Sequence, residues 1–333
     1  MKMKNSSIRS FFGLTLCMPL LALTACGGDD DETTPVTPAA QIQLGGEVER
    51  PAAYTVADLQ KQTAVTQTVT YASGTTPQTR TYTGASLWSF LDGAGIKTNA
   101  AVKNDVLGKY VVATGADGYR AVFSTGELKP DFGNRESVLA YAETLNGVSA
   151  ALSATDGPVR ATAPGDVKGG RYVSNLTRVD VRASGSTKTT VGGGVSTSFT
   201  ISGAVVRPGS YNLAALQALP AVTRQAGTSA YTGVDLWYLL NTVAGIKPPT
   251  DAKNATLAMY VVATGSDGYQ TLVSLGEIDP GFGAKPDLVA YSLDGTALTQ
   301  NGFARLVLPE DQRTSRYISN LVDLEVFAAP VAP

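Results

Sequence analysis

Short runs of alternating apolar and polar residues predict a chain built mainly from strands. Gln41–Val48 and Val65–Tyr71 both alternate with the period of two that is typical of a half-buried strand. Leu87, Phe90 and Leu91 instead stand at positions i, i+3 and i+4, which predicts an amphipathic helix. The pattern therefore indicates a mostly β core with a few short helices.

Turn and capping residues divide the next stretch into a hairpin and a helix. Tyr110–Thr114 and Tyr119–Phe123 are predicted strands, and Ala116-Asp117-Gly118 is the turn that joins them. Ser124 and Glu127 have the spacing of a capping box, so they are expected to open a short helix. Two more strands are expected to complete the sheet, Ser137–Ala142 and Tyr172–Val181.

The strongest pattern in the chain is a repeat of whole motifs. Tyr110–Tyr119 reads YVVATGADGY, and Tyr260–Tyr269 reads YVVATGSDGY. Other motifs recur in the same order, Ser124–Glu127 as Ser274–Glu277 and Arg171–Leu176 as Arg316–Leu321. The spacing is far longer than the ~20–50 residues of a solenoid repeat, so it predicts a duplicated domain.

We therefore predict an α+β fold that consists of two tandem copies of one mostly β domain. The copies are residues 41–183, the first half, and residues 199–328, the second half. The segment 184–198 between them is rich in Gly, Ser and Thr and is the expected linker. A chain of 333 residues suits two domains of ordinary size.

Composition and charge exclude several classes of function. The net charge is −2 without a basic cluster, which argues against nucleic-acid binding. The chain contains no histidine, so it has neither a Ser-His-Asp triad, nor an HExxH zinc site, nor an axial histidine for haem. Cys17 and Cys26 are the only cysteines, and both precede the predicted domains. The domains therefore lack disulfides and thiolate metal ligands.

The N-terminal segment has the features of a targeting signal. Three basic residues precede the apolar run Phe11–Leu23, which is short for a membrane span. Leu23-Thr24-Ala25-Cys26 resembles a bacterial lipobox, and this resemblance implies cleavage after residue 25 and lipidation of Cys26. Residues 26–40 then form a flexible tether. An ordinary signal peptide is the alternative.

The targeting signal predicts a location in the cell envelope. No Asp follows Cys26, and such an Asp is known to retain lipoproteins of this kind in the inner membrane. We expect a lipid anchor in the outer membrane, on its periplasmic or its surface face.

The order of motifs in each copy resembles a known family. The first copy contains YTGASLWSFLDGAG (residues 82–95), an Asp-Gly-Tyr turn, a Ser-x-x-Glu turn, Gly-Pro-x-Arg-x-x-x-Pro and Arg-Tyr-x-x-x-Leu. This order resembles the molybdopterin-binding oxidoreductase domain of the sulfite oxidase type, in its compact stand-alone form. The resemblance covers nearly all of each copy and makes molybdopterin the possible cofactor.

Two features that the resemblance implies are missing from this chain. Active members hold molybdenum through a cysteine in the strand that here corresponds to residues 65–74 and 221–227, and neither segment has one. A lysine near the last strand helps to hold the cofactor phosphate, but the matching positions read Val173-Ser174-Asn175 and Ile318-Ser319-Asn320. Because both copies lack both groups, no metal ligand is predicted and the copies are expected to be degenerate.

Several repeated residues are candidates for a binding site, each with a structural alternative. Asp117, Tyr119, Asp267 and Tyr269 could line a pocket or could only shape a hairpin turn. Glu127 and Glu277 could act as a general acid or base, or could only cap a helix. Trp88 and Trp237 with Tyr82 and Tyr231 could stack on a flat ligand, although core packing is the simpler interpretation.

Two arginines near the end of the first copy recur in the second copy, and these four are the strongest candidates. They are Arg160, Arg171, Arg305 and Arg316. An arginine can bind a phosphate or carboxylate through two donors, and surface ion pairs are the alternative.

Three functions remain open from the sequence. The leading hypothesis is a lipid-anchored envelope protein whose degenerate domains bind a small anionic or flat ligand or serve as an accessory scaffold, rather than an enzyme. The second is an oxidoreductase that holds molybdopterin without a protein thiolate, with Arg171 and Arg316 as contacts. The third is a surface interaction module, in which two copies increase avidity for an unidentified protein or glycan.

Overall fold

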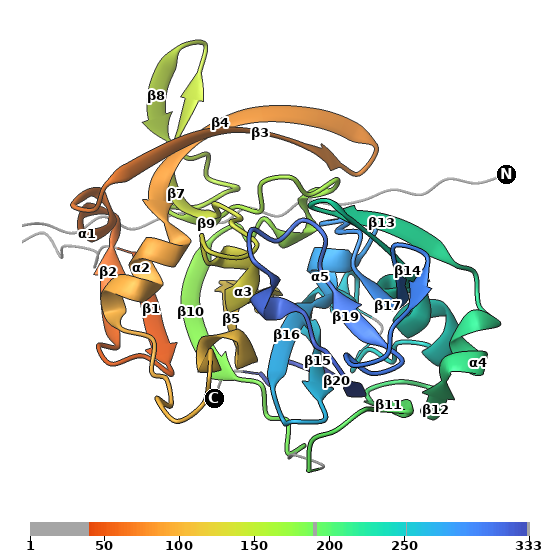
Figure 1. Cartoon of the computed structure of the whole chain (residues 1–333). Coiled ribbons are helices and arrows are strands. Elements are labelled where there is room, and N and C mark those ends of the chain that lie inside the picture. Colours follow the sequence, from red (N-terminus) through yellow and green to blue (C-terminus); the bar gives the residue numbers. More distant parts are fainter. Residues whose placement is uncertain (1–39, 189–191, 251, 332–333) are drawn as a thin grey trace, which may run out of the picture. The chain divides into compact units, whose positions relative to one another are not determined.

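Two β-sheets build each half of the chain. The computed structural model describes residues 40–188, 192–250 and 252–331, which belong to one compact unit (Figure 1). In the first half one sheet has the strand order β2-β1-β10-β5-β6, and the other has the order β3-β4-β7-β8 with β9 paired to β7. The elements of the first half are β1 (Gln41–Gly46), β2 (Ala52–Thr55), α1 (Val56–Gln60), β3 (Ala64–Ser73), β4 (Thr76–Ser86), α2 (Leu87–Ala94), η1 (Asp105–Gly108), β5 (Lys109–Gly115), β6 (Arg120–Ser124), α3 (Thr125–Leu128), β7 (Val138–Leu145), β8 (Val148–Ala151), β9 (Arg160–Ala161), η2 (Gly169–Arg171) and β10 (Leu176–Ala183).

The second half has the same strand order in both of its sheets. They are β12-β11-β20-β15-β16 and β13-β14-β17-β18 with β19 paired to β17. Its elements are β11 (Ser198–Gly203), β12 (Gly209–Asn212), α4 (Leu213–Gln217), β13 (Val222–Ala226), β14 (Ser229–Asp235), η3 (Tyr238–Ala244), η4 (Ala255–Ala258), β15 (Met259–Gly265), β16 (Gln270–Ser274), α5 (Leu275–Ile278), β17 (Leu288–Leu293), β18 (Thr296–Ala297), β19 (Arg305–Val307), η5 (Thr314–Arg316) and β20 (Leu321–Ala328). The fold is thus mostly β.

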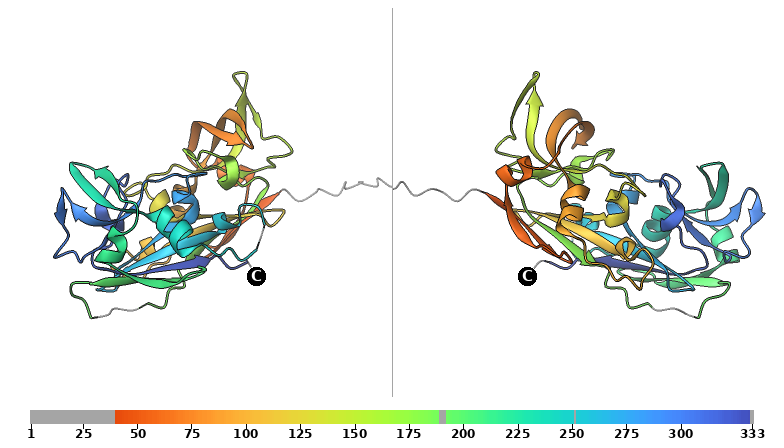
Figure 2. Two further views of the ribbon diagram at one scale, coloured as in Figure 1. Left: turned by 90° about the vertical axis from the view of Figure 1, so that its right-hand side faces the viewer. Right: turned by 60° about the vertical axis from the view of Figure 1, so that its left-hand side comes forward.

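The halves differ most in the hairpin before the first long helix. β3 and β4 have 10 and 11 residues, whereas the corresponding β13 and β14 have 5 and 7. The long β3–β4 hairpin and the β7–β8 hairpin rise from the same side of the first half (Figures 1 and 2). The hairpins β3–β4 and β7–β8 of the first half are therefore longer than the corresponding hairpins β13–β14 and β17–β18 of the second half.

The repeated motif YVVATG forms β5 and β15, and both of these strands are buried on their two faces. Val111 and Ala113 of β5 pack into the core of the first half. Tyr110 and Val112, on the other face, join a third apolar cluster with Tyr260 and other residues of the second half. The Tyr110 and Tyr260 ring centroids are 4.3 Å apart. Burial on both faces explains why this stretch is continuously apolar instead of alternating.

Most predicted strands are present, but one begins later than predicted and several strands were not predicted. Strands cover the predicted ranges around β1, β3, β5, β6 and β7, and α2 spans the predicted amphipathic segment. The predicted strand Tyr172–Val181 is wrong at its start, because η2 is followed by an irregular segment and β10 begins only at Leu176. The sequence prediction also omitted β4, whose polar, threonine-rich start gives no strong apolar signal.

The predicted linker is partly fixed to the second half. The Tyr260 hydroxyl donates to the Ser184 carbonyl at 2.6 Å, and the Ser266 hydroxyl donates to the Gly194 carbonyl at 2.6 Å. Cys26 and the predicted signal peptide lie outside the described residues. No helix within the described ranges is long and apolar enough to cross a membrane.

Candidate functional site

Arg171 lies at the centre of a buried ion-pair network between the halves. Its Nε and Nη2 atoms donate to the two carboxylate oxygens of Asp166 at 2.8 and 2.7 Å, and its Nη1 atom donates to Glu127 Oε1 at 2.5 Å. The side chain is 0% exposed. Arg135 pairs with both carboxylates, so two negative charges meet two positive charges. This network is internally satisfied.

Arg316 repeats this arrangement in the second half. Its Nη1 and Nη2 atoms each donate to one oxygen of Glu277 at 2.9 Å, and Nη1 also donates to Asp311 at 3.1 Å. The two networks are joined reciprocally. The Ser124 hydroxyl donates to Glu277 at 3.2 Å, and the Ser274 hydroxyl donates to Glu127 at 3.0 Å.

The glycine of the repeated Ser-x-Gly-Glu motif makes room for these arginines. A Cβ atom on Gly126 would lie 2.6 Å from Nε of Arg316, and one on Gly276 would lie 2.5 Å from Cδ of Arg171. Each glycine thus admits the arginine of the other half. The motif repeats because the contact between the halves is reciprocal.

The buried network corrects two sequence interpretations. Arg171 and Arg316 are not ligand contacts at an open site, nor are they surface ion pairs, because both are fully enclosed. Glu127 and Glu277 open helices α3 and α5, and Glu127 closes the predicted capping box with Ser124. Burial opposes ionisation of Glu127, but Arg171 and Arg135 lower its pKa below the ordinary value. Its position in the interface does not support an acid–base role.

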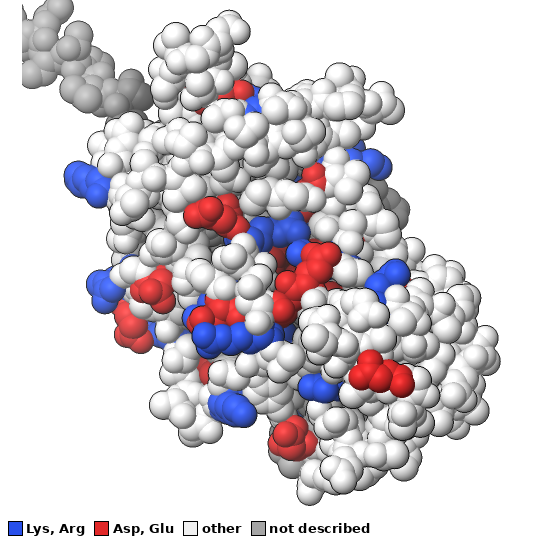
Figure 3. Space-filling model, turned by 45° about the horizontal axis from the view of Figure 1, so that its top comes forward, with Lys and Arg blue, Asp and Glu red and all other residues white. Residues whose placement is uncertain are grey.

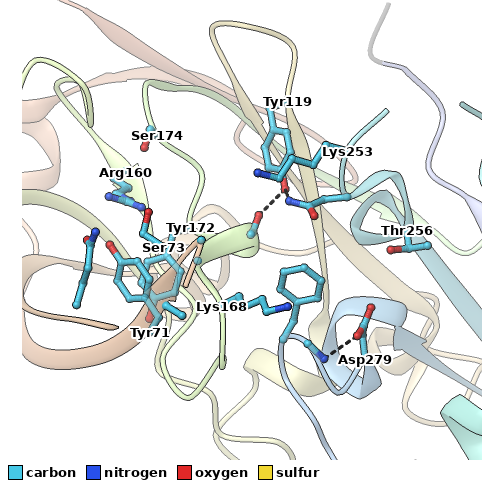
Figure 4. A pocket seen from close by; sticks show the side chains of 18 of the residues that line it. Tyr71, Ser73, Tyr119, Arg160, Lys168, Tyr172, Ser174, Lys253, Thr256 and Asp279 are labelled. Atoms are coloured by element: carbon cyan, nitrogen blue, oxygen red, sulfur yellow. Dashed lines mark hydrogen bonds between the residues drawn. The ribbon is translucent and has the colours of Figure 1, made fainter. Parts of the chain in front are cut away.

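A cleft of about 1230 Å³ opens in the first half and is the main candidate site (Figure 4). Its floor carries Tyr71 and Tyr172, whose rings stack with centroids 4.2 Å apart. Tyr71 comes from β3, so the long hairpin directly provides one wall. Figure 3 shows charged side chains of both signs gathered near the centre of one face of the molecule, among largely uncharged residues.

Arg160 lies against the tyrosine floor of this cleft. Its guanidinium carbon is 5.4 Å from the Tyr172 ring centroid and 5.8 Å from that of Tyr71. It pairs with Asp156, which also accepts an ion pair from Arg80 at 2.7 Å. Burial opposes ionisation of Asp156, but the two arginines lower its pKa. The ion pair with Asp156 therefore holds Arg160 in place.

Two buried polar atoms of the cleft floor have no hydrogen-bond partner among the described residues. They are Nε of Arg160 and the hydroxyl of Tyr172. Both side chains are more than nine-tenths buried, at 7% and 4% exposure. Leaving a buried polar atom unpaired typically costs about 1–3 kcal/mol, and such atoms often mark a place for a ligand or a bound water.

Two lysines at the rim of the cleft are exposed and make no ion pair within the described part of the chain. Lys168 precedes η2, and Lys253 comes from the second half, just before η4. Figure 4 shows Lys253 beside Tyr119 and Lys168 on the side of Asp279. Asp279 is partly buried, and burial raises its pKa above the ordinary value. The rim thus presents two cations to an incoming ligand.

A second and smaller cleft of about 400 Å³ occupies the corresponding place in the second half. It is lined by Tyr269, Tyr317 and Asp267, together with Lys103 from the first half. The short strands β13 and β14 do not contribute to it. Arg305 lies nearby, with its guanidinium carbon 5.2 Å from the Tyr317 ring centroid, and makes no ion pair in the described ranges. The four candidate arginines thus separate into two buried network residues and two residues on tyrosine platforms.

The Asp-Gly-Tyr turns both shape a hairpin and line a cleft, which are the two interpretations given by the sequence. Asp117 accepts from the backbone N–H of Tyr119 at 2.9 Å, and Asp267 accepts from that of Tyr269 at 3.0 Å, so both aspartates shape their turns. The tyrosines line the clefts. Burial raises the pKa of Tyr119, which keeps its hydroxyl protonated at neutral pH.

The aromatic candidates are mainly structural. Trp88 and Trp237 are half-buried and pack against the cores of their halves. Tyr82 is completely buried, and its hydroxyl accepts from Arg160 at 3.1 Å. Tyr231 is also buried and packs edge-on against Tyr317 at 6.2 Å. Tyr71, Lys168 and Lys253 also line the first cleft, but they were not predicted from the sequence. Only Tyr71 could have been suspected, because it lies in the strand where the family resemblance places a ligand.

A comparison with protein families identifies the first half. A family model described as the oxidoreductase molybdopterin binding domain matches residues 33–190. The first half matches the molybdopterin-binding oxidoreductase domain family. This confirms the resemblance for that half, while the second half lies outside the matched range and its assignment stays a prediction.

Comparisons with whole proteins add less. The sulfane dehydrogenase SoxCD from Paracoccus pantotrophus is similar at 14% identity, over 88% of this chain and 78% of that chain, with a TM-score of 0.36. No curated protein matches the chain significantly.

The first cleft is reached by the strand in which the family resemblance puts a metal ligand. β3, the strand in which the resemblance puts the ligand cysteine, reaches the cleft with Tyr71 and Ser73. Residues 27–333 contain no cysteine, and the whole chain contains no histidine. The described residues include no group of three His, Cys, Asp or Glu that could hold a metal ion. These donors do not fit a molybdenum centre ligated by the protein.

Proposed function

We propose that this chain is a lipid-anchored binding protein of the bacterial cell envelope. Two tandem copies of a molybdopterin-oxidoreductase-like domain serve as its scaffold, and the first cleft binds a small, flat, anionic ligand. The identical strand order of the two halves supports the duplication. The lipobox-like sequence that ends at Cys26 supports lipidation and an outer-membrane anchor.

The observation that carries the binding function is the chemistry of the first cleft. The stacked rings of Tyr71 and Tyr172 line the floor of the cleft, where a planar ligand can pack against their exposed edges. Arg160 lines the cleft beside these rings, and a guanidinium group is of the type that binds carboxylate or phosphate. The rim lysines add positive charge without thiol or imidazole donors. This donor set suits an organic anion and not a metal.

The binding function predicts that a flat phosphate binds better than the same molecule without phosphate. Flavin mononucleotide should bind the wild-type protein about a hundredfold more tightly than riboflavin, because Arg160 and the two rim lysines together add several charge-assisted contacts. Arg160→Gln should reduce this difference about fivefold. Isothermal titration calorimetry on the soluble form released from its anchor measures both affinities.

Arg305→Gln is the matched control for this experiment. Arg305 occupies the same place in the second half, but it does not line the first cleft. The variant should bind both flavins like the wild type. Equal binding of the two flavins by the wild-type protein, or an equal loss in both variants, would contradict the assignment of the first cleft.

A molybdopterin-dependent oxidoreductase without a protein thiolate is the second candidate function. The family match and the position of β3 in the cleft favour it. Its original form, with Arg171 and Arg316 as cofactor contacts, conflicts with their complete burial. In the remaining form Arg160 and the rim lysines would hold the anionic part of the cofactor.

A further inference from the structure

Residues of the second half form part of the first cleft. Lys253, Asn254 and Thr256 line it from the segment around η4. Asn254 adopts the left-handed conformation with φ 60°, and its side-chain amide donates to the Tyr119 hydroxyl at 3.3 Å. That hydroxyl donates to the Gly170 carbonyl at 2.6 Å. The hydrogen-bond chain fixes the second half against the wall of the first cleft.

The same contacts exist in the opposite direction at the second cleft. Asn104 donates to the Tyr269 hydroxyl at 2.9 Å, and this hydroxyl donates to the Ser315 carbonyl at 2.7 Å. Lys103 lines the second cleft just as Lys253 lines the first. The backbone framework of the two clefts is therefore equivalent, and any functional difference must come from their side chains.

The two halves also differ in whether a second cation near the cleft has an ion-pair partner. Arg313 stands at the position that corresponds to Lys168, and it pairs with Asp131 at 3.4 Å. Asp131 is also paired with Lys129 at 2.7 Å. The position of Asp131 in the motif is taken by Gly281 in the second half, and the carboxylate near Lys168 is instead Asp279, which makes no ion pair with it. Arg313 therefore has an ion-pair partner and does not line the second cleft, whereas Lys168 lines the first cleft without an ion pair among the described residues.

We infer that the second half completes the ligand site of the first. Lys253 of the second half and Lys168 of the first half bind the anionic group of one ligand, and the chain takes up one such anion and not two. The smaller volume and the missing hairpin wall of the second cleft agree with this difference. The inference rests on the proposed binding function and assigns the second half a direct role in it.

Flavin titrations of matched lysine variants test the inference. Lys253→Gln and Lys168→Gln should each weaken flavin mononucleotide binding about fivefold and leave riboflavin binding unchanged, because each removes one cation that faces the phosphate. Lys103→Gln removes the equivalent lysine of the second cleft and should have no effect. The stoichiometry should be one flavin mononucleotide per chain. All three lysines are exposed, so thermal unfolding should show unchanged stability.

The outcomes separate this inference from the function on which it rests. If the wild type prefers flavin mononucleotide but Lys253→Gln binds it equally well, the role of the second half is overturned and the binding function stands. Two phosphate sites per chain, or an equal loss in Lys103→Gln, would overturn it in the same way. If the wild type does not distinguish the two flavins, the proposed function itself fails.

Discussion

Arg171→Ala should lower the free energy of unfolding by about 3–5 kcal/mol, the cost of breaking a buried ion pair from one side. The substitution leaves Glu127 and Asp166 in a buried place with only Arg135 to compensate them. It also removes the hydrogen bond of 3.5 Å from Arg171 Nη1 to the Ser274 hydroxyl in the other half. Arg316→Ala should have a similar effect, because Glu277 then loses both of its guanidinium donors.

Urea unfolding followed by circular dichroism measures this loss. Lys61→Ala is the control, because Lys61 pairs with Asp58 on the surface and such pairs contribute about 0–1 kcal/mol. Since the two networks share Ser124 and Ser274, the double variant Arg171→Ala/Arg316→Ala should lose less than the sum of the single losses. A loss below 1 kcal/mol in either single variant would contradict the described network.

Stability should rise as the pH falls from 7 to about 5, because the second half contains a buried excess of carboxylates. Asp287, Asp311 and Glu277 lie around Arg316, whereas the first half matches two carboxylates with two arginines. Burial raises the pKa of Asp311 to about 6 and that of Asp287 well above its ordinary value. Glu277 further raises both values, while Arg316 and Lys285 lower them.

The direction follows from proton uptake on folding. Above pH 3.8, the ordinary pKa of an aspartate, Asp287 and Asp311 have lost their protons in the unfolded chain. In the folded chain they keep these protons up to a higher pH. Stability therefore falls as the pH rises through this window. For Asp311 the change of about two units corresponds to about 3 kcal/mol. Below pH 4 the trend reverses, because Glu127 and Asp156 have lowered pKa values and lose their ion pairs.

Asp287→Asn isolates this effect. The amide has nearly the same shape and does not require a proton, so the variant should be more stable than the wild type at pH 7. At pH 4 the gain should disappear, since both chains then carry a neutral group at this position. Asp92→Asn, on the exposed face of α2, is the control and should not change the pH profile. A gain that does not depend on pH would contradict the explanation.

Local features of the fold were predictable because their causes are local. The helix Leu87–Ala94 follows from the spacing of three apolar residues, and α3 follows from the Ser124 and Glu127 capping pair. The Asp117-Gly118 turn follows from the backbone preferences of those residues. Each of these features depends on residues within one or two turns of the chain.

The function of the arginines was not predictable, because their partners are far away in sequence. Ser274 is 147 positions from the Glu127 carboxylate that it contacts, and Arg316 is 192 positions from Ser124. One sequence signal was available. The glycine that both Ser-x-Gly-Glu motifs share has no role in capping, and such a glycine is typical of a close approach by another group.

The asymmetry of the clefts could have been found by comparing the copies position by position. Asp156 of the first half corresponds to Asn301, and Asp131 corresponds to Gly281. These differences decide which arginine or lysine is paired, but their meaning depends on knowing that the residues lie around equivalent clefts. The motifs that are most alike in the two copies form the shared scaffold. The positions that differ lie around the clefts.

Mass spectrometry under native conditions, together with metal analysis of the full-length protein, tests most directly whether the first cleft binds an organic anion. We expect a bound organic anion that is not a pterin, lost in Arg160→Gln and retained in Arg305→Gln, without stoichiometric molybdenum. One molybdenum per chain, accompanied by a fluorescent pterin on denaturation, would contradict it.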